Sequence, residues 1–224
     1  MKVKLNCVTQ PESMDGGKIF DAPLLIEEYM IYAARVSSPD NRLNHETAPK
    51  LLEYLIDSKH WSPFEMVSMA FEIETSRAIA QQLLRHRSFS FQEFSQRYAE
   101  VTELESVELR YQAKKNRQSS TDVCDCPELV KEVNNHLHAS AELYRRLLRY
   151  GIAKESARFV LPLTAQTTLI MHGTLRSWIH FLDQRCDEHA QKEVQLIALE
   201  IRKQLTTVCP WTASALGWNN THQQ

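Results

Sequence analysis

The sequence predicts an α+β fold, in which a small and mostly antiparallel sheet is combined with five or six helices. Two periodicities point to this class. Residues 3–8 and 66–74 alternate between apolar and polar side chains, as strands with one buried face do. Residues 24–36 and 127–150 carry apolar side chains three and four positions apart, which is the spacing of an amphipathic helix. We expect the 224 residues to form a single domain, 1–224.

The other elements follow in order from the same patterns. Further helices are predicted over residues 47–57, 76–87, 152–158, 166–182 and 188–207. Thr47 stands at the start of the first of these, where a hydroxyl side chain can cap a helix. The polar segments 37–45 and 112–127 are predicted to be loops, and the second is expected to be a mobile loop or lobe.

The composition excludes several classes of protein. The sequence has no apolar run long enough for a membrane span, and its first residues lack the apolar stretch of a signal peptide. The five cysteines are scattered and odd in number, so we expect reduced thiols and a cytoplasmic location. Cys124 and Cys126 have no second pair of ligands at zinc spacing, and no metal site is predicted. There are five glycines but no GxGxxG or P-loop motif, so side chains would have to hold a phosphate.

One short segment concentrates arginine and aromatic side chains. Residues 85–98, RHRSFSFQEFSQRY, hold three arginines and four aromatic rings, although the net charge of the chain is only -2. Arg85, His86 and Arg87 are expected in the last turn of a helix, where the helix dipole favours cations. Guanidinium groups bind phosphate in a bidentate manner and stack on flat rings. The segment therefore indicates a planar anionic ligand, which is a nucleotide, a flavin or a nucleic acid strand.

A second set of basic residues recurs with helical spacing. His172, Arg176 and His180 lie four residues apart on one predicted helix, and Arg185 and His189 repeat the interval. Such a stripe is usually a solvated helix face. The remaining residues of this helix are mostly apolar, however, which favours a buried pocket or interface lined by cations.

Three further residues have ordinary structural explanations. Arg158 precedes an apolar run and suits a surface ion pair, and His60 suits a hydrogen-bonded turn. Cys209 has no neighbour that would lower its pKa, so we interpret it as a packing residue rather than a nucleophile.

The 85–98 segment resembles the signature of flavin-dependent thymidylate synthases, the ThyX family. In that family, Arg-His-Arg is followed after seven residues by Ser, with Glu two positions before the Ser and Arg two after it. Here these residues are Arg85, His86, Arg87, Glu93, Ser95 and Arg97. Further blocks match in order at residues 60–65, 157–162, 175–177, 180–181 and 185–191, so that the resemblance spans about residues 31–213.

The resemblance implies a ThyX fold and a methyltransferase reaction. dUMP would be methylated at C5 to dTMP, with 5,10-methylenetetrahydrofolate as carbon donor, FAD as hydride carrier and NADPH as reductant. It also implies a homotetramer whose active sites lie between subunits, and no protein nucleophile. A nucleic-acid-binding module is the alternative, although a pI of about 6.5 disfavours it. A flavoenzyme with other chemistry on a pyrimidine is a second alternative.

The resemblance also implies roles for individual residues. Arg185 is expected at the uracil edge, where its guanidinium would favour ionisation at N3 and so make C5 more nucleophilic. The residues expected to contact FAD are His60, Ser62, Arg85, His86, Arg87, Glu93, Thr174, Arg176 and His180. Those expected to bind dUMP are Gln82, Arg85, Glu93, Phe94, Ser95, Gln96, Arg97, Arg158 and Arg185. Gln92, Gln96 and Thr174 depart from the residues that many family members carry at these positions.

Overall fold

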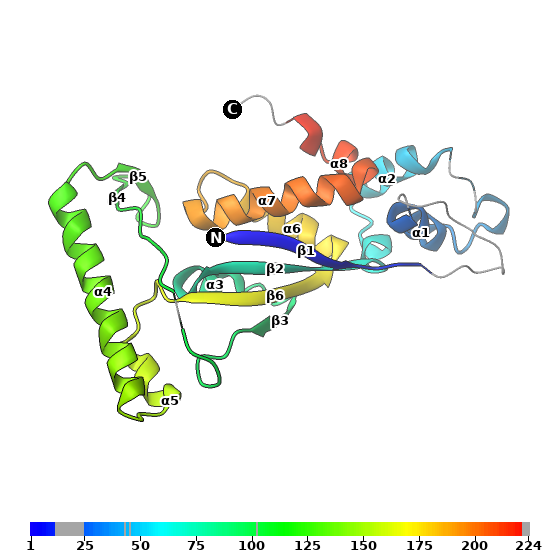
Figure 1. Ribbon diagram of the computed structural model, residues 1–224. Helices are drawn as coiled ribbons and strands as arrows, with labels where there is room; N and C mark the ends of the chain where they lie inside the picture. Colours follow the sequence, from blue (N-terminus) through cyan, green and yellow to red (C-terminus); the bar gives the residue numbers. More distant parts are fainter. Residues whose placement is uncertain (12–24, 43, 45, 102, 221–224) are drawn as a thin grey trace.

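The centre of the computed structural model, which describes residues 1–11, 25–42, 44, 46–101 and 103–220, is a four-stranded sheet (Figure 1). In spatial order its strands are β1 (Lys2–Val8), β2 (Ser68–Ser76), β6 (Gln166–Thr174) and β3 (Ser90–Glu93). All neighbouring strands are antiparallel. The α+β class and the small antiparallel sheet are therefore confirmed.

The two central strands supply much of the core. Phe71 of β2 pairs with Met171 of β6, and Ile73 pairs with Leu169. All four side chains are fully buried. Removing an apolar side chain of this size from water stabilises the fold by roughly 1.5–3 kcal/mol. The buried sheet thus fixes the positions at which the segments that follow its strands begin.

Eight α-helices occur in the described part of the chain, more than the five or six expected. They are α1 (Leu25–Ala34), α2 (Ala48–Asp57), α3 (Arg77–Leu83), α4 (Pro127–Arg149), α5 (Lys154–Ala157), α6 (Leu175–Arg185), α7 (Lys192–Val208) and α8 (Pro210–Ala215). Short 3-10 helices span Pro39–Asn41, Ser62–Glu65, Arg158–Val160 and Trp218–Asn220. None of these helices is long and apolar enough to cross a bilayer.

The predicted helix over residues 166–182 is wrong. Its first half is strand β6, which pairs with β2 along its whole length, and only its second half is the helix α6. The close approach of Phe89 explains why position 173 of this strand is glycine, because a Cβ there would lie 2.5 Å from Cδ1 of the Phe89 ring. His172 consequently does not share a helix with Arg176 and His180. It lies on the strand, with Nε2 3.2 Å from the hydroxyl of Ser68.

The helix predicted over residues 76–87 is shorter than expected. α3 ends at Leu83, so Arg85, His86 and Arg87 follow the helix instead of forming its last turn. The chain turns here because the Phe89 ring packs into the core, 4.6 Å from the ring of Trp178. The three basic residues are thereby presented on a tight connection between α3 and β3.

Two smaller predictions also need correction or fall outside the described residues. Thr47 occupies the position before α2, but its side chain does not cap the helix. Its hydroxyl instead accepts a 2.7 Å hydrogen bond from Nη2 of Arg35. Residue 24, where the first helix was expected to start, and residues 43 and 45 of the predicted 37–45 loop lie outside the described part.

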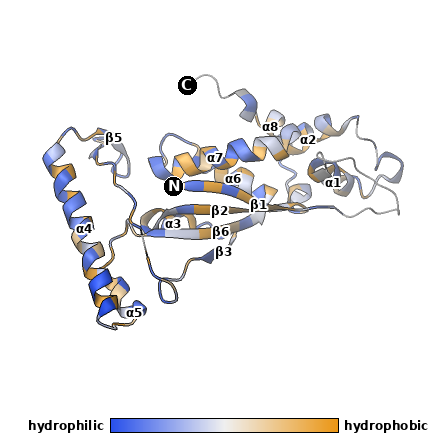
Figure 2. Ribbon diagram, viewed as in Figure 1, coloured by the Kyte–Doolittle hydropathy of each residue, from blue (hydrophilic) through white to orange (hydrophobic). Residues whose placement is uncertain are grey.

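The predicted 112–127 loop is partly a β-hairpin. Its strands are β4 (Arg110–Gln112) and β5 (Ser120–Val123), and α4 begins directly afterwards. Figure 1 shows the hairpin, α4 and α5 beyond one end of the sheet. Figure 2 shows that much of α4 is hydrophilic, whereas apolar residues concentrate around the sheet. A small second apolar cluster lies at this end of the fold, formed by Val101, Tyr144, Ala157 and Ala165.

Candidate active site

A buried helix brings Arg185 to the basic turn that follows α3. Trp178, Phe181 and Leu182 of α6 are almost fully buried, so the helix has little freedom to rotate. Its last residue, Arg185, donates a 3.0 Å hydrogen bond from Nε to Nε2 of His86. The His86 ring also packs edge-on against Phe181, with 4.9 Å between ring centroids. α6 thus positions both partners of the pair.

His86 is neutral near pH 7. Burial, together with the positive charge of Arg185, lowers the pKa of His86 from 6.5 to about 4. A neutral imidazole carries one donor and one acceptor. Because Nε2 accepts from Arg185, the ring proton is on Nδ1. The two terminal nitrogens of Arg185 have no partner in the described part of the chain and remain available for a ligand.

The pair lines a cavity of about 600 Å³. The cavity walls come from α3 and the turn after it, the end of α6, the connection to α7 and the β4–β5 hairpin. The lining residues are Gln82, Arg85, His86, Gln118, Gln184, Arg185, His189, Ala190 and Gln191. The structure therefore brings together Gln82, Arg85, His86 and Arg185, which were all predicted to be site residues.

Several site arginines lack an acidic partner. Among the described residues, no ion pair involves Arg85, Arg87, Arg158 or Arg185. Arg85 and Arg87 are also exposed. Arg85 and Arg185 line the same cavity, and guanidinium groups without carboxylate partners favour binding of an anion. This donor set fits the planar anionic ligand that the sequence indicates.

Glu93 is held in place by two partners. Its Oε1 accepts a 2.6 Å bond from Nη1 of Arg77 and a 3.0 Å bond from the hydroxyl of Thr167. The following residue, Phe94, donates its backbone N–H to the carbonyl of Thr168 at 2.8 Å. The end of β3 is therefore a fixed starting point for the loop at residues 95–97. Arg77 was not predicted from the sequence, because nothing in the local pattern links it to Glu93.

The loop after β3 contains an unsatisfied polar group. Gln96 is 8% exposed, and its Nε2 has no hydrogen-bond partner in the described part of the chain. An unpaired buried amide costs roughly 1–3 kcal/mol. Ser95 and Arg97 on either side are exposed, and Arg97 lies 3.7 Å from Glu155 of α5. A bound anion would supply the missing acceptor.

The 60–65 turn packs against the first half of α6. The ring of Trp61 lies 4.9 Å from that of His180, and Arg176 forms an ion pair with Glu65. The turn that carries His60 and Ser62 is thereby brought to the helix that carries Arg176 and His180. Thr174, by contrast, caps α6, since its hydroxyl accepts the backbone N–H of Ser177 at 3.3 Å.

Comparison with known proteins assigns the chain to a family. Residues 24–211 match the family described as "Thymidylate synthase complementing protein". The chain is 48% identical over 223 residues to a flavin-dependent thymidylate synthase from Synechocystis sp., covering 97% of this chain and 100% of the relative. The chain belongs to the flavin-dependent thymidylate synthase family.

Two further relatives agree with this assignment. A probable flavin-dependent thymidylate synthase of Paramecium bursaria Chlorella virus 1 is 44% identical over 222 residues, which are 97% of this chain and all of the relative. The crystal structure of the UMP/dUMP methylase PolB from Streptomyces cacaoi, bound with 5-Br dUMP, matches with a TM-score of 0.79 at 27% identity. It covers 96% of this chain and 94% of that chain. The predicted family and fold are confirmed.

Within one chain of this thymidylate synthase, the predicted dUMP residues fall into two groups. Gln82, Arg85 and Arg185 line the cavity. Residues 93–97 and Arg158 do not. The Arg158 guanidinium carbon lies 5.7 Å from the centre of its neighbour's ring, Phe159. The surface ion pair considered for Arg158 is not formed among the described residues.

Five residues of the cavity were not predicted to be site residues. His189, Ala190 and Gln191 lie in the 185–191 block that matches the family but were given no role, and Gln118 and Gln184 were not singled out at all. Gln118 lies in a polar segment that gives no local sign of approaching α6.

The thiols of Cys186 and Cys209 are poorly suited to act as nucleophiles. Burial raises the pKa of Cys186, and burial with the nearby charge of Glu27 raises that of Cys209 well above its ordinary value. Thiolates are the reactive form of cysteine. In the described part of the chain, no three His, Cys, Asp or Glu side chains are grouped so as to hold a metal ion.

Proposed function

We propose that this protein methylates dUMP to dTMP as a flavin-dependent thymidylate synthase. The carbon donor is 5,10-methylenetetrahydrofolate, and NADPH is the reductant. The observation that carries the proposal is the convergence of Arg85, Arg185 and a neutral His86 in one cavity of a family member, where neither guanidinium forms an ion pair in the described part of the chain.

Arg185 is the proposed catalytic residue. Its terminal N–H groups face no carboxylate in the described part of the chain, so they are free to stabilise negative charge on the uracil ring. Loss of the N3 proton would place that charge beside the guanidinium. His86 acts through Arg185, because its lone pair at Nε2 orients the guanidinium plane. His86 is therefore a positioning residue in this step, as well as a proposed flavin contact.

The phosphate of dUMP is proposed to lie at the loop formed by Ser95, Gln96 and Arg97. The unpaired Nε2 of Gln96 supplies a buried donor, and the exposed Arg97 supplies charge. Glu93, fixed by Arg77, sets the start of this loop. We assign the remaining predicted contacts, from Gln82, Phe94 and Arg158, to the same nucleotide.

FAD is proposed to lie against the 60–65 turn and α6. When bound, FAD supplies the hydride that completes the methyl group. The proposed contacts are His60, Ser62, Arg85, His86, Arg87, Glu93, Thr174, Arg176 and His180. Arg87 has no carboxylate partner among the described residues and suits the flavin's phosphates. Thr174 already caps α6, so its flavin contact would come from the oxygen lone pair left free.

We further propose a homotetramer with shared active sites. Arg158 lies outside the cavity of its own chain, and the neighbouring side chain of Phe159 is 82% exposed, as is that of Tyr150 at the end of α4. Large exposed aromatic groups beside an unpaired cation are typical of an interface. If a second subunit binds at this surface, Arg158 of the first subunit would contact the nucleotide bound to the second.

Two coarser expectations belong to the same proposal. We regard residues 1–224 as one functional domain, in which the hairpin, α4 and α5 form an inserted lobe. The five free cysteines support a cytoplasmic location, since thiols persist in reducing compartments.

A binding experiment tests the proposed function. Purified protein should retain or take up FAD and show a flavin absorbance spectrum, and it should bind dUMP in the flavin-loaded state. A protein that takes up neither ligand, and instead binds single-stranded nucleic acid, would support the alternative of a nucleic-acid-binding module.

A further inference from the structure

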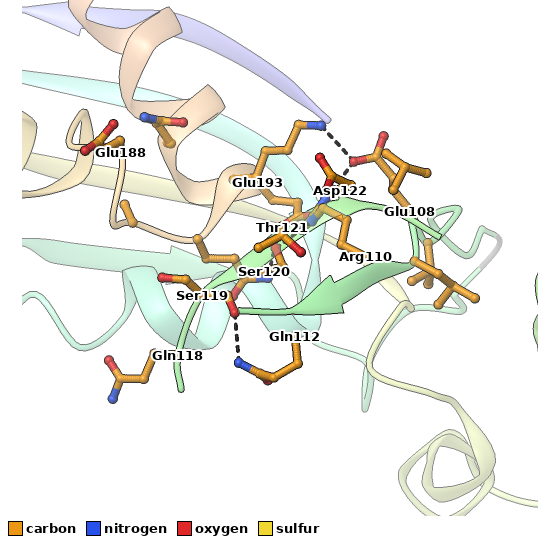
Figure 3. A pocket seen from close by; sticks show the side chains of 17 residues that line it. Glu108, Arg110, Gln112, Gln118, Ser119, Ser120, Thr121, Asp122, Glu188 and Glu193 are labelled. Atoms are coloured by element: carbon orange, nitrogen blue, oxygen red, sulfur yellow. Dashed lines mark hydrogen bonds and ion pairs between the residues drawn. The ribbon is translucent and has the colours of Figure 1, made fainter. Parts of the chain in front are cut away.

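The β4–β5 hairpin forms a wall of the catalytic cavity. A second cavity of about 730 Å³ separates the hairpin from the residues that lead into α7, as Figure 3 shows. The two cavities share three lining residues, Gln118, Ala190 and Gln191. Gln118, at the end of the hairpin turn, therefore stands where the two cavities meet.

An ionic network holds the hairpin to α7. Arg110 of β4, whose side chain is 11% exposed, donates from Nη2 to Glu193 at 2.5 Å and from Nη1 to Glu108 at 2.8 Å. Its Nε donates to the hydroxyl of Ser120 at 2.9 Å. Lys192 donates to the same Glu108 at 2.7 Å. Because the central Arg110 is largely shielded and bonds three partners at once, this branched network positions a segment better than a single exposed ion pair does.

The hairpin turn is stiffened by its own side chains. Nε2 of Gln112 donates to the carbonyl of Ser119 at 2.9 Å (Figure 3). Oδ1 of Asn116 accepts the backbone N–H of Gln118 at 3.0 Å, and its Nδ2 donates to the Ser119 hydroxyl at 2.7 Å. These bonds use the backbone of Gln118 but leave its side-chain amide without a partner in the described part of the chain.

The amide of Gln118 supplies the cavity with a hydrogen-bond acceptor as well as a donor. Guanidinium groups are donors only. The acceptor of His86 is already used by Arg185, and Oε1 of Gln191 already accepts from Nε2 of Gln82. Oε1 of Gln82 and the amides of Gln118 and Gln184 have no partner in the described part of the chain, and of these only Gln118 comes from the hairpin. A pyrimidine ring presents an N–H donor beside carbonyl acceptors, and a carboxamide can satisfy both kinds of group.

We propose that Gln118 binds the pyrimidine ring of dUMP and that Arg110 is a positioning residue that holds Gln118 in the cavity. This inference rests on the proposed function, because it takes dUMP as the occupant. It adds the hairpin, which the site residues expected from the sequence did not include, to the substrate-binding machinery.

The test compares dUMP affinity of the FAD-loaded protein for wild type, Gln118→Met, Arg110→Met and the double variant. Gln118→Met keeps the length of the side chain but removes the amide. It should weaken dUMP binding about tenfold, which is typical of one lost hydrogen bond to a ligand. KM should rise by a similar factor with kcat changed less, since the contact is present throughout the reaction. Arg117→Ala, which changes an exposed neighbour outside both cavities, is the control and should bind dUMP normally.

The double variant separates positioning from general loss of structure. Arg110→Met should weaken dUMP binding in the wild-type background but add little in the Gln118→Met background, because both changes remove the same contact. Normal dUMP binding by Gln118→Met would overturn the proposal, and so would an undiminished effect of Arg110→Met in the double variant. Failure of the wild type itself to bind dUMP would instead contradict the proposed function.

Discussion

Arg185 and His86 form one unit, in which Nε of the guanidinium donates to Nε2 of the imidazole at 3.0 Å. The two residues are far apart in the sequence and meet because α6 packs against the turn after α3. The bond fixes the plane of the guanidinium and leaves its terminal N–H groups for a ligand. Catalysis by Arg185 would therefore depend on the planar arrangement of its N–H donors as well as on its charge.

Arg185→Lys should lower kcat on the order of 10²-fold, because lysine keeps the charge but cannot form the planar fork or the bond to His86. Arg97→Lys is the matched comparison. Arg97 is exposed and is proposed to hold a phosphate that is charged throughout the reaction, so this change should mainly raise KM for dUMP. Steady-state kinetics decide between these outcomes, with circular dichroism to check folding. An effect of Arg185→Lys on KM alone would move the N3 role to another residue.

His86 should make the stability of the fold depend on pH. Its pKa in the folded protein is about 4, below the ordinary value of 6.5. Between these values the unfolded chain takes up a proton that the folded protein does not. The contribution of neutral His86 to the free energy of unfolding is therefore fully present above about pH 6.5 and decreases as the pH falls toward 4. Urea unfolding at several pH values measures this slope.

His86→Gln provides the control for that slope. Glutamine offers an acceptor but does not titrate, so this variant should lose part of the pH dependence of the free energy of unfolding between pH 6.5 and 4. An identical slope in the wild type and the variant would show that His86 does not titrate as its burial indicates.

The sequence could predict the sheet strands that have one buried face, but it could not predict β6. Residues 166–174 are apolar or hydroxylic at most positions, and such a run fits a buried helix as well as a central strand. The outcome is decided by pairing with β2 and β3, which are distant in the sequence. The four-residue spacing of His172 and Arg176 therefore does not place them on one helix, because His172 lies in β6 and Arg176 in α6.

The candidate site shows the same limit. The family signature is local in sequence, and two of its residues, Arg85 and His86, line the cavity, whereas Arg87, Glu93, Ser95 and Arg97 do not. The contacts of Glu93 with Arg77 and of Arg110 with Glu193 depend on how distant segments pack. Gln118 gave no signal, since its polar surroundings are those of any exposed loop.

No cysteine should be essential for methyl transfer. Single changes of Cys7, Cys124, Cys126, Cys186 and Cys209 to Ala should each leave dTMP formation measurable. Cys209 is fully buried, so Cys209→Ala should lower the melting temperature, whereas the exposed Cys7 serves as the neutral control. Complete inactivation of a folded single variant would indicate a covalent cysteine mechanism.

Light scattering should give a mass of about 104 kDa, four times the 26.0 kDa chain. If Arg158 serves the active site of a neighbouring subunit, subunits carrying Arg158→Ala and subunits carrying Arg185→Lys should complement each other. Dissociating and mixing the two variants should restore part of the activity, because some hybrid sites then contain both native arginines. An active monomer, or mixed variants that stay as inactive as the parents, would contradict the shared site.

The most direct test of the whole account is the formation of dTMP from dUMP by the purified protein. The protein is stripped of flavin and then supplied with 5,10-methylenetetrahydrofolate and NADPH, with and without FAD, and the product is identified by mass spectrometry. The account predicts dTMP only when FAD is present. Formation of dTMP without any flavin, or no dTMP from folded protein that has bound both FAD and dUMP, would contradict it.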